Sequence, residues 1–323
     1  MSTFKYVLQR IGLMIFTFLI IMIICFVLIK LLPNPIEAAP GAAYEIELAR
    51  REALGYGKPI IEQLFIYAKN IITKWDWGVS LKIDYMHDVT EVVGDRLVPT
   101  LMINVYSLIF SIPIGILFGI FAALKKNRWQ DHVISTGVMI FISVPSFVYA
   151  FLVQYLFGFE WNLLPPIAAS LNDAGGTYFS WTMFKSWILP ILALSFGTIA
   201  GLCRNTRAEL TEALTSEYML LARTKGLTKA QAITRHALKN AMVPILPGII
   251  SSFVGILGGS LIIEQIFAVP GVGRLYMTAL TLRDYDVFMF DTAFYTFIGL
   301  ASNILIDLSY GFLDPRVRMG SKR

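Results

Sequence analysis

The chain contains 323 residues, of which 56% are hydrophobic and 15% are charged, and its net charge is +5. A soluble domain carries about a quarter charged residues, whereas several apolar runs here reach the roughly 20 residues that cross a bilayer core. The composition therefore excludes a soluble protein and indicates a polytopic membrane protein. The basic residues gather in a few loops, which fits membrane topology better than nucleic-acid binding.

Six membrane-spanning helices are predicted. Residues 1–10 form a cytoplasmic N-terminus, residues 11–32 the first span and residues 33–99 a long external segment. The apolar run from Ile11 to Ile29 exceeds the signal-peptide core of roughly 7–15 residues, so the first span is expected to be retained. A membrane domain, residues 100–312, holds the other five spans at 101–124, 131–157, 187–203, 244–267 and 287–312, and residues 313–323 form a basic cytoplasmic tail.

Three of these spans carry local signals. Pro145 lies inside the third span and is expected to kink it, because proline has no N–H to donate. Trp187 begins the fourth span and is expected to anchor it at the membrane interface. Pro244 and Pro247 are expected in the first turn of the fifth span, where a missing N–H costs least.

Two glycine pairs have the spacing that lets membrane helices approach closely. Gly115 and Gly119 lie in the second span, and Gly255 and Gly259 in the fifth. Such spacing is common by chance, so each pair is a weak signal for helix packing.

The basic residues lie on one side of this topology. They are Lys5, Arg10, Lys125, Lys126, Arg128, Arg204, Arg207, Arg223, Lys225, Lys229, Arg235, Lys239, Arg316, Arg318, Lys322 and Arg323. The short loops of the other side hold only Lys185, Arg274 and Arg283. The positive-inside rule therefore places both termini and the basic loop around residues 204–242 in the cytoplasm. The multi-pass chain is expected in the plasma or inner membrane of a cell.

The external segment contains apolar residues at near-helical spacing between Ile60 and Ile72, followed by Trp75 and Trp77. This pattern predicts an amphipathic helix. Two placements are open: the helix lies on the outer membrane surface, or it belongs to a packed external lid.

A cytoplasmic loop, residues 204–242, separates the fourth and fifth spans. Residues 211–224 have helix-forming composition and no Gly or Pro,. Gly226 then occupies the position of a helix-ending residue with positive φ, and Leu227 the position that folds back in a Schellman motif. The run from Thr228 to Gln231 is a capping box that starts a second helix. The loop is predicted to form a helix, a tight glycine turn and a helix.

An ordinary basic loop whose helices extend the fourth and fifth spans would also account for the composition. A passive linker, however, has no need of capping chemistry at one fixed point. A small exposed turn flanked by charge suits insertion into a groove on a partner, so a docking surface is the favoured interpretation.

The segment Glu217-Tyr-Met-Leu-Leu-Ala-Arg-Thr-Lys-Gly-Leu227, followed by Arg235-His-Ala-Leu-Lys-Asn-Ala241 and Pro244, resembles the coupling loop of ABC importer permeases. More narrowly, it resembles the dipeptide, oligopeptide and nickel permease family. Matches outside the loop are Leu31-Leu-Pro-Asn-Pro35, Glu264-Gln-Ile-Phe-Ala-Val-Pro-Gly-Val-Gly-Arg-Leu275 and Asp307-Leu-Ser-Tyr-Gly-Phe-Leu-Asp-Pro-Arg316. The Leu-Leu-Pro segment and the long external insert resemble the B-type subunit rather than the C-type subunit.

The resemblance implies an all-α polytopic membrane protein with six transmembrane helices, the type I ABC importer permease fold and a cytoplasmic coupling helix. The residues that match the ATPase-docking coupling helix are Glu217, Tyr218, Ala222, Arg223, Thr224, Lys225, Gly226 and Leu227. The implied partners are a homologous C-type permease subunit, two ABC ATPase subunits, an extracytoplasmic substrate-binding protein, the lipid bilayer and a peptide substrate. No cofactor is expected on this chain, and ATP and Mg²⁺ are expected on the ATPase subunits.

The chain departs from the general importer pattern at several positions. Leu220 and Leu221 replace a Glu-Ala pair, and Lys239 stands where a proline is usual. These changes bear on which ATPase docks. Asn34 and Asp291 also replace residues more usual in the family.

The chain is not expected to be an enzyme. It has no Gly-x-x-x-x-Gly-Lys-Ser/Thr phosphate loop,. His87, His132 and His236 lack metal-ligand spacing, and Cys25 and Cys203 are poorly placed for a disulfide or a metal site.

Polar residues at membrane depth are the candidates for the translocation pathway, because burying them in lipid is costly. They are Glu264, Asp291 and Asn303, with Asp307 near the inner boundary. Glu264 and Asp291 lie near the outer boundary and Asp307 near the inner one, and satisfaction there by water or a basic partner is the favoured interpretation. For Asn303, a helix–helix hydrogen bond is favoured.

The predicted function is the transmembrane permease subunit of an ATP-driven peptide importer. A nickel-chelate importer of the same family is an alternative. From other classes, a proton-coupled secondary transporter would use Glu264 and Asp291 to carry protons, and a membrane scaffold or sensor would move no substrate. The lack of a recognisable internal repeat weakens the secondary-transporter alternative.

Overall fold

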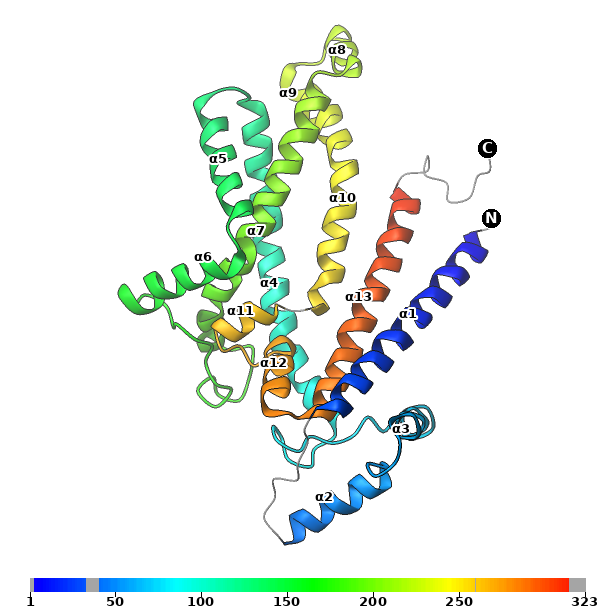
Figure 1. Cartoon of the computed structure of the whole chain (residues 1–323). Helices are drawn as coiled ribbons and strands as arrows, with labels where there is room; N and C mark the ends of the chain where they lie inside the picture. Colours follow the sequence, from blue (N-terminus) through cyan, green and yellow to red (C-terminus); the bar gives the residue numbers. More distant parts are fainter. Residues whose placement is uncertain (1–2, 33–40, 259, 314–323) are drawn as a thin grey trace. The chain divides into compact units, whose positions relative to one another are not determined.

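A computed structural model shows an almost entirely helical chain (Figure 1) and describes residues 3–32, 41–258 and 260–313. Within these ranges there is no strand, and one isolated antiparallel bridge joins Val79 and Asp88. Asn34 and the tail after Leu313 lie outside the described residues. The chain divides into two compact units, residues 1–97 with 275–301 and residues 98–274 with 302–323.

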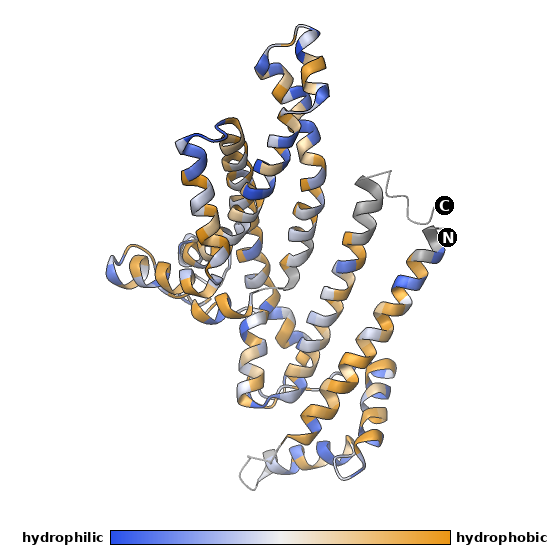
Figure 2. Cartoon of the chain, turned by 45° about the horizontal axis from the view of Figure 1, so that its top comes forward, coloured by the Kyte–Doolittle hydropathy of each residue, from blue (hydrophilic) through white to orange (hydrophobic). Residues whose placement is uncertain are grey.

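The first unit holds the N-terminal helix and the segment expected outside the membrane. Its helices are α1 (Thr3–Leu31), α2 (Ala42–Ala53), α3 (Ile60–Lys74), the start of α4 (Val89–Leu124), the end of α12 (Val272–Leu282) and most of α13 (Tyr285–Leu313). Hydrophobic residues run along most of α1 (Figure 2). The predicted amphipathic helix is confirmed as α3.

Helix α4 begins inside the segment expected to be external. The Asp88 carboxylate accepts a hydrogen bond from the Thr90 backbone N–H at 2.7 Å, which caps the first turn. Helix α4 then runs for 36 residues and includes Pro99 and Pro113. The boundary predicted at residues 99 and 100 therefore falls within a helix.

Helix α7 organises the second unit, because α5, α6 and α10 all pack against it (Figure 1). The helical elements after α4 are α5 (Trp129–Ser143), α6 (Ser146–Val153), the π-helix η1 (Gln154–Glu160), α7 (Trp181–Leu214), α8 (Glu217–Thr224), α9 (Lys229–Ala232), the π-helix η2 (Ile233–Ala237), α10 (Leu238–Val254), the 3₁₀-helix η3 (Gly255–Gly258) and α11 (Leu261–Ile266).

Within the described ranges, four helices can cross a membrane by length and composition: Val7–Leu31, Val89–Leu124, Trp181–Leu214 and Tyr285–Ile306. Residues Trp129–Ser143 and Ser146–Glu160 give a fifth if they count as one span, although they are bent by 104°. The bend falls at Pro145, where a kink was expected. Proline cannot donate the helical hydrogen bond, and the residue before it avoids the helical region: Val144 has ψ 129°.

The expectation of one continuous fifth span at residues 244–267 is wrong. Helix α10 ends at Val254 after 17 residues, which corresponds to about 26 Å at 1.5 Å per residue. A 3₁₀ segment and the separate helix α11 follow, in a stretch whose glycines favour helix less than other residues do. Pro244 and Pro247 also lie inside α10 rather than in a first turn.

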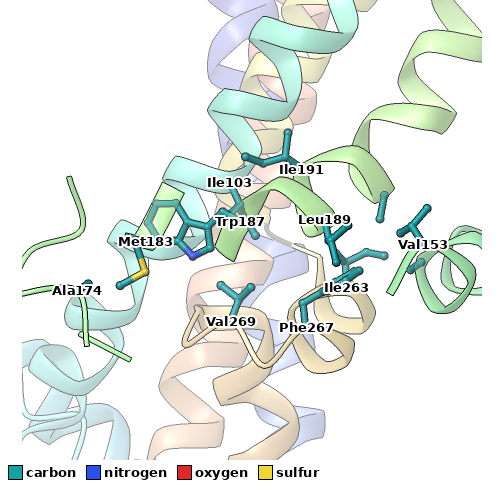
Figure 3. Packing of buried hydrophobic residues seen from close by; sticks show 12 residues of the cluster. Ile103, Val153, Ala174, Met183, Trp187, Leu189, Ile191, Ile263, Phe267 and Val269 are labelled. Carbon is teal, nitrogen blue, oxygen red and sulfur yellow. The ribbon is translucent and has the colours of Figure 1, made fainter. Parts of the chain in front are cut away.

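Trp187 does not anchor the fourth span at an interface. Its side chain is completely buried in the main hydrophobic cluster of the second unit, with Met183, Ile103 and Val269 (Figure 3). Helix α7 begins earlier than expected, at Trp181, so Trp187 lies within the second turn of the helix. The membrane-interface preference of tryptophan is overridden here by burial of its large ring.

The close helix approach predicted at Gly115 and Gly119 is confirmed between α4 and α7. A Cβ atom added at Gly119 would lie 2.5 Å from the Thr206 Cβ and 2.8 Å from the Cys203 carbonyl oxygen. One added at Gly115 would lie 2.8 Å from the Leu202 Cβ. The second predicted pair differs: no described atom lies within 4 Å of a Cβ at Gly255, and Gly259 is outside the described residues.

Candidate functional site

The predicted glycine turn is present at the end of α8. Gly226 has φ +90°, a conformation that residues with a Cβ adopt at a cost. Its N–H donates to the Arg223 carbonyl at 3.0 Å, and the Leu227 N–H donates to the Ala222 carbonyl at 3.3 Å. These two bonds define the Schellman motif, so this prediction is confirmed.

The helix that follows starts with the predicted capping box. The Gln231 N–H donates to the Thr228 hydroxyl at 3.3 Å, and the Thr228 N–H donates to the Gln231 side-chain oxygen at 3.0 Å. Each bond satisfies an N–H that has no partner within the helix. The direction of the chain is therefore fixed on both sides of Gly226.

The helix expected over residues 211–224 is divided into two. Helix α7 continues past the predicted span to Leu214, and α8 begins at Glu217. The Ser216 hydroxyl donates to the Ala213 carbonyl at 2.6 Å, which satisfies the end of α7. The alternative in which helices extend the neighbouring spans is thus partly confirmed, and α8 is an additional element between them.

A core of small side chains supports this loop. The buried members of this core are Ala222 of α8, Ala213 of α7, Ala123 of α4, Ala232, Ala237, Ala241, Leu210 and Met219. Short side chains let helices approach closely. In Figure 1 the loop lies at the end of α7 and α10. Helix α8 is therefore held on a packed base.

The eight predicted docking residues divide between this base and the surface. Ala222 is buried, and Tyr218 and Leu227 pack against the alanine core. The residues that face outward are Glu217, Arg223, Thr224, Lys225 and Gly226. Two residues that mark the departure from the importer pattern also face outward: Leu220 is 69% exposed and Leu221 is 55% exposed.

Glu264, a pathway candidate, is fully buried within the second unit. Its carboxylate accepts hydrogen bonds from the Thr100 hydroxyl at 3.0 Å and the Arg274 N–H at 3.1 Å. The Thr100 hydroxyl in turn accepts from the Val272 N–H at 2.9 Å. This network fastens the turn before α12 to α4 and gives Glu264 a structural role. Its role in the pathway stays a prediction.

The other pathway candidates differ in exposure. Asp291 is completely buried in the first unit, and Asn303 on α13 is exposed. The Asp307 side chain lies outside the described residues. A pathway role for Asp291 and Asn303 stays a prediction as well.

An ion pair that the sequence did not indicate joins α5 to α7. The Arg207 guanidinium donates to both oxygens of Asp131, with Nη2 to Oδ2 at 2.8 Å. The Asn127 N–H and the Ser135 hydroxyl complete the carboxylate's partners at 2.9 and 3.2 Å. The pair spans 76 positions of sequence, and Arg207 was counted only among the basic residues of the loop. The one sequence signal for this pair was Asp131 itself, an acidic residue in the first turn of α5.

These elements define an all-α polytopic membrane protein in which α8 packs on a core formed by the ends of α4, α7 and α10. The family model "Binding-protein-dependent transport system inner membrane component" matches residues 115–319. The chain is 32% identical to the dipeptide transport system permease protein DppB of Lactococcus lactis subsp. cremoris (strain MG1363) over 315 residues, 98% of this chain and 99% of the relative.

Two further relatives cover the same extent. Identity is 32% over 322 residues to the dipeptide transport system permease protein DppB of Bacillus subtilis (strain 168), 98% of this chain and 99% of the relative. It is 31% over 318 residues to the glutathione transport system permease protein GsiC of Escherichia coli (strain K12), 97% of this chain and 99% of the relative. The chain belongs to the family of binding-protein-dependent transport system inner membrane components, which confirms the resemblance read from the sequence.

Proposed function

We propose that this chain is the transmembrane permease subunit of an ATP-driven ABC importer for peptides. It forms half of the translocation pathway and docks an ATPase subunit through α8. In the proposed topology α8 and both termini lie in the cytoplasm. The observation that supports docking above all is the exposed pair Leu220 and Leu221 on the helix that Gly226 ends.

A large apolar pair exposed in a polar, basic loop indicates a surface that a partner covers. Glu217, Arg223 and Lys225 are exposed around it, an apolar centre with a charged rim. The alanine core beneath keeps the backbone of α8 in place. A preformed surface of this kind binds with less loss of conformational entropy than a flexible loop.

The relatives' names, dipeptide and glutathione permeases, support a peptide as the transported substrate. The proposed complex contains a homologous C-type permease subunit, two ATPase subunits that bind ATP and Mg²⁺, and an extracytoplasmic binding protein. ATP binding closes the ATPase pair and moves α8, and the spans change from inward- to outward-facing. The two states are a conformational equilibrium biased by a ligand on another chain.

The double variant Leu220→Ser/Leu221→Ser tests the surface without straining the backbone. Co-purification of ATPase chains and peptide uptake should both fall at least about tenfold, because buried apolar anchors dominate interface energy. Leu163→Ser is the matched control, since Leu163 is also an exposed leucine of this unit at 59%. Retention of ATPase chains and of uptake by the double variant would remove the main support for docking.

Gly226→Val supplies a second test of the same helix. No described atom lies within 4 Å of a Cβ at Gly226, so valine meets strain from the positive φ and no steric clash. We expect the variant to reach the membrane but to lose peptide-stimulated ATP hydrolysis. Normal stimulation would show that the turn does not transmit the ATPase signal.

The energy source and the substrate need separate measurements. Uptake should stop on ATP depletion and persist when the proton gradient is dissipated. The reverse pattern would select the secondary-transporter alternative. Competition by peptides of graded length, with Ni²⁺ as a parallel competitor, separates peptide import from nickel-chelate import.

A further inference from the structure

The first unit contains a cavity of about 280 Å³ at the Lys30 end of α1. Its lining comes from α1, α2, α3, the loop before α4 and the start of α13, and includes Lys30, Tyr67, Trp77 and Asp286. This volume is close to the lower end of the roughly 300–1,000 Å³ typical of small-molecule sites. The coupling loop and the pathway candidate Glu264 lie in the other unit, so this cavity is a separate feature.

The cavity contains a cation, Lys30, that forms no direct ion pair; the Asp286 carboxylate acts on it only at longer range. The Lys30 ammonium lies 3.5 Å from the centroid of the Tyr56 ring and 5.3 Å from that of Phe26. Among the described residues it has no hydrogen-bond acceptor and no ion-pair partner. Ring faces stabilise the charge, and of the three N–H donors of the ammonium those that point away from the Tyr56 ring stay available.

Two further donors in the cavity wall lack acceptors. The Tyr67 hydroxyl and the Trp77 indole N–H are buried and have no hydrogen-bond partner among the described residues. Burial raises the pKa of the Tyr67 phenol, so this hydroxyl keeps its proton. Buried donors are normally paired, which indicates that a ligand or solvent supplies acceptors here.

The carboxylates of the cavity are already engaged. Asp286 pairs with the Arg50 guanidinium, and Asp76 accepts a hydrogen bond from the Gly78 N–H at 3.0 Å. The unmatched groups are thus two cations, Lys30 and the exposed Lys74, and two neutral donors, against a single unmatched acceptor, the Gln63 side-chain oxygen. This balance favours an anionic ligand.

The surfaces beside the cavity suit lipid. On α3 the residues Ile61, Phe65 and Ile72 are 59%, 70% and 82% exposed, and their spacing puts them on one face of the helix. Gln63 and Tyr67 on the other face line the cavity. Helix α1, which also lines the cavity, is a candidate membrane span, and only 6% of its most apolar stretch is buried. An exposed apolar face next to a span is typical of a helix at the membrane interface.

We propose that this cavity binds the phosphate headgroup of a phospholipid from the leaflet at the Lys30 end of α1. Lys30 is the ionic partner, and the Tyr67 hydroxyl and Trp77 indole donate to the phosphate oxygens. The acyl chains lie along α1. Of the two placements open for the amphipathic helix, this selects the membrane surface. The proposal does not rest on the docking function of α8.

Native mass spectrometry of the full chain, purified in detergent with its co-purifying partners and titrated with phosphatidylglycerol, tests this site. Lys30→Gln should weaken phospholipid binding at least about tenfold, as expected for loss of a charged hydrogen bond. Tyr67→Phe should weaken it several-fold, while Lys30→Arg keeps most of the affinity. Tyr155→Phe is the matched control, because Tyr155 is exposed and lies in the other unit.

Equal lipid binding by wild type and Tyr67→Phe, or by wild type and Lys30→Gln, would overturn the proposal. If Lys30→Gln fails to insert, Tyr67→Phe decides alone. Competition identifies the source of the anion: displacement of the bound lipid by millimolar inorganic phosphate or by a dipeptide would show a free-anion site and overturn the lipid assignment. Resistance to both competitors supports it.

Discussion

Removing Arg207 should destabilise the chain more than neutralising its partner Asp131. The Asp131 side chain is 2% exposed, whereas the Arg207 side chain is 33% exposed. In Arg207→Met the buried carboxylate keeps only the Asn127 N–H and the Ser135 hydroxyl. Breaking a buried ion pair from one side costs about 3–5 kcal/mol, and the partial exposure of Arg207 puts the expected cost near 3 kcal/mol.

Asp131→Asn removes the charge but keeps an acceptor oxygen, and water can reach the partly exposed guanidinium. Its expected cost is about 1–2 kcal/mol. Unfolding of the full chain by SDS in mixed micelles measures both values, and the double variant gives a coupling energy of about 1–2 kcal/mol. Arg204→Met is the control, since Arg204 is exposed. An Arg207→Met variant no less stable than Asp131→Asn or Arg204→Met would refute the buried-carboxylate argument.

Two further predictions use the same unfolding measurement and hydrogen exchange. Gly119→Ala should cost about 1–3 kcal/mol, because the new Cβ would lie 2.5 Å from that of Thr206,. Gly201→Ala on α7, with no described atom within 4 Å of its Cβ, should be neutral or stabilising by up to about 1 kcal/mol, and equal effects would contradict the close approach. Glu264→Gln should cost about 1–3 kcal/mol and accelerate exchange of the Arg274 amide. The NH₂ group of the new glutamine would replace one carboxylate oxygen and would face a hydrogen-bond donor, the Thr100 hydroxyl or the Arg274 N–H. Unchanged exchange would show that the carboxylate does not hold that turn.

The features that the sequence predicted correctly are local. The turn at Gly226 and the capping box at Thr228 depend on residues within a few positions, and each needs a particular side chain or the lack of one. The close approach at Gly115 and Gly119 was predictable as a property of one helix face. Its partner, α7, was not predictable, because nothing in the spacing identifies the facing helix.

The features that the sequence missed depend on tertiary packing. The Asp131–Arg207 pair joins residues 76 positions apart, and each residue alone fits an ordinary basic loop. Trp187 fits an interfacial anchor by type, but it is buried in a cluster that includes Ile103 of α4 and Val269 of the turn before α12. The break after Val254 could not be located either, since an apolar run rich in glycine fits both a continuous span and a divided one.

The packing of the second unit limits how a displacement of α8 can be transmitted. Helix α8 shares its alanine core with the ends of both α4 and α7, through Ala123 and Ala213. Helices α4 and α7 are in turn in backbone contact at Gly115 and Gly119, where interlocked helices slide only at the cost of a steric clash. The Arg207 pair fastens α5 to α7 as well.

A displacement of α8 at Leu220 and Leu221 would therefore move α4, α5 and α7 together, and a rotation of α4 against α7 is unfavourable. Two of the breaks between helices in the described part of this unit adjoin helices that pack against α7, namely η3 after α10 and the 104° bend between α5 and α6. These two interruptions are where a conformational change driven through α8 is expected to be absorbed.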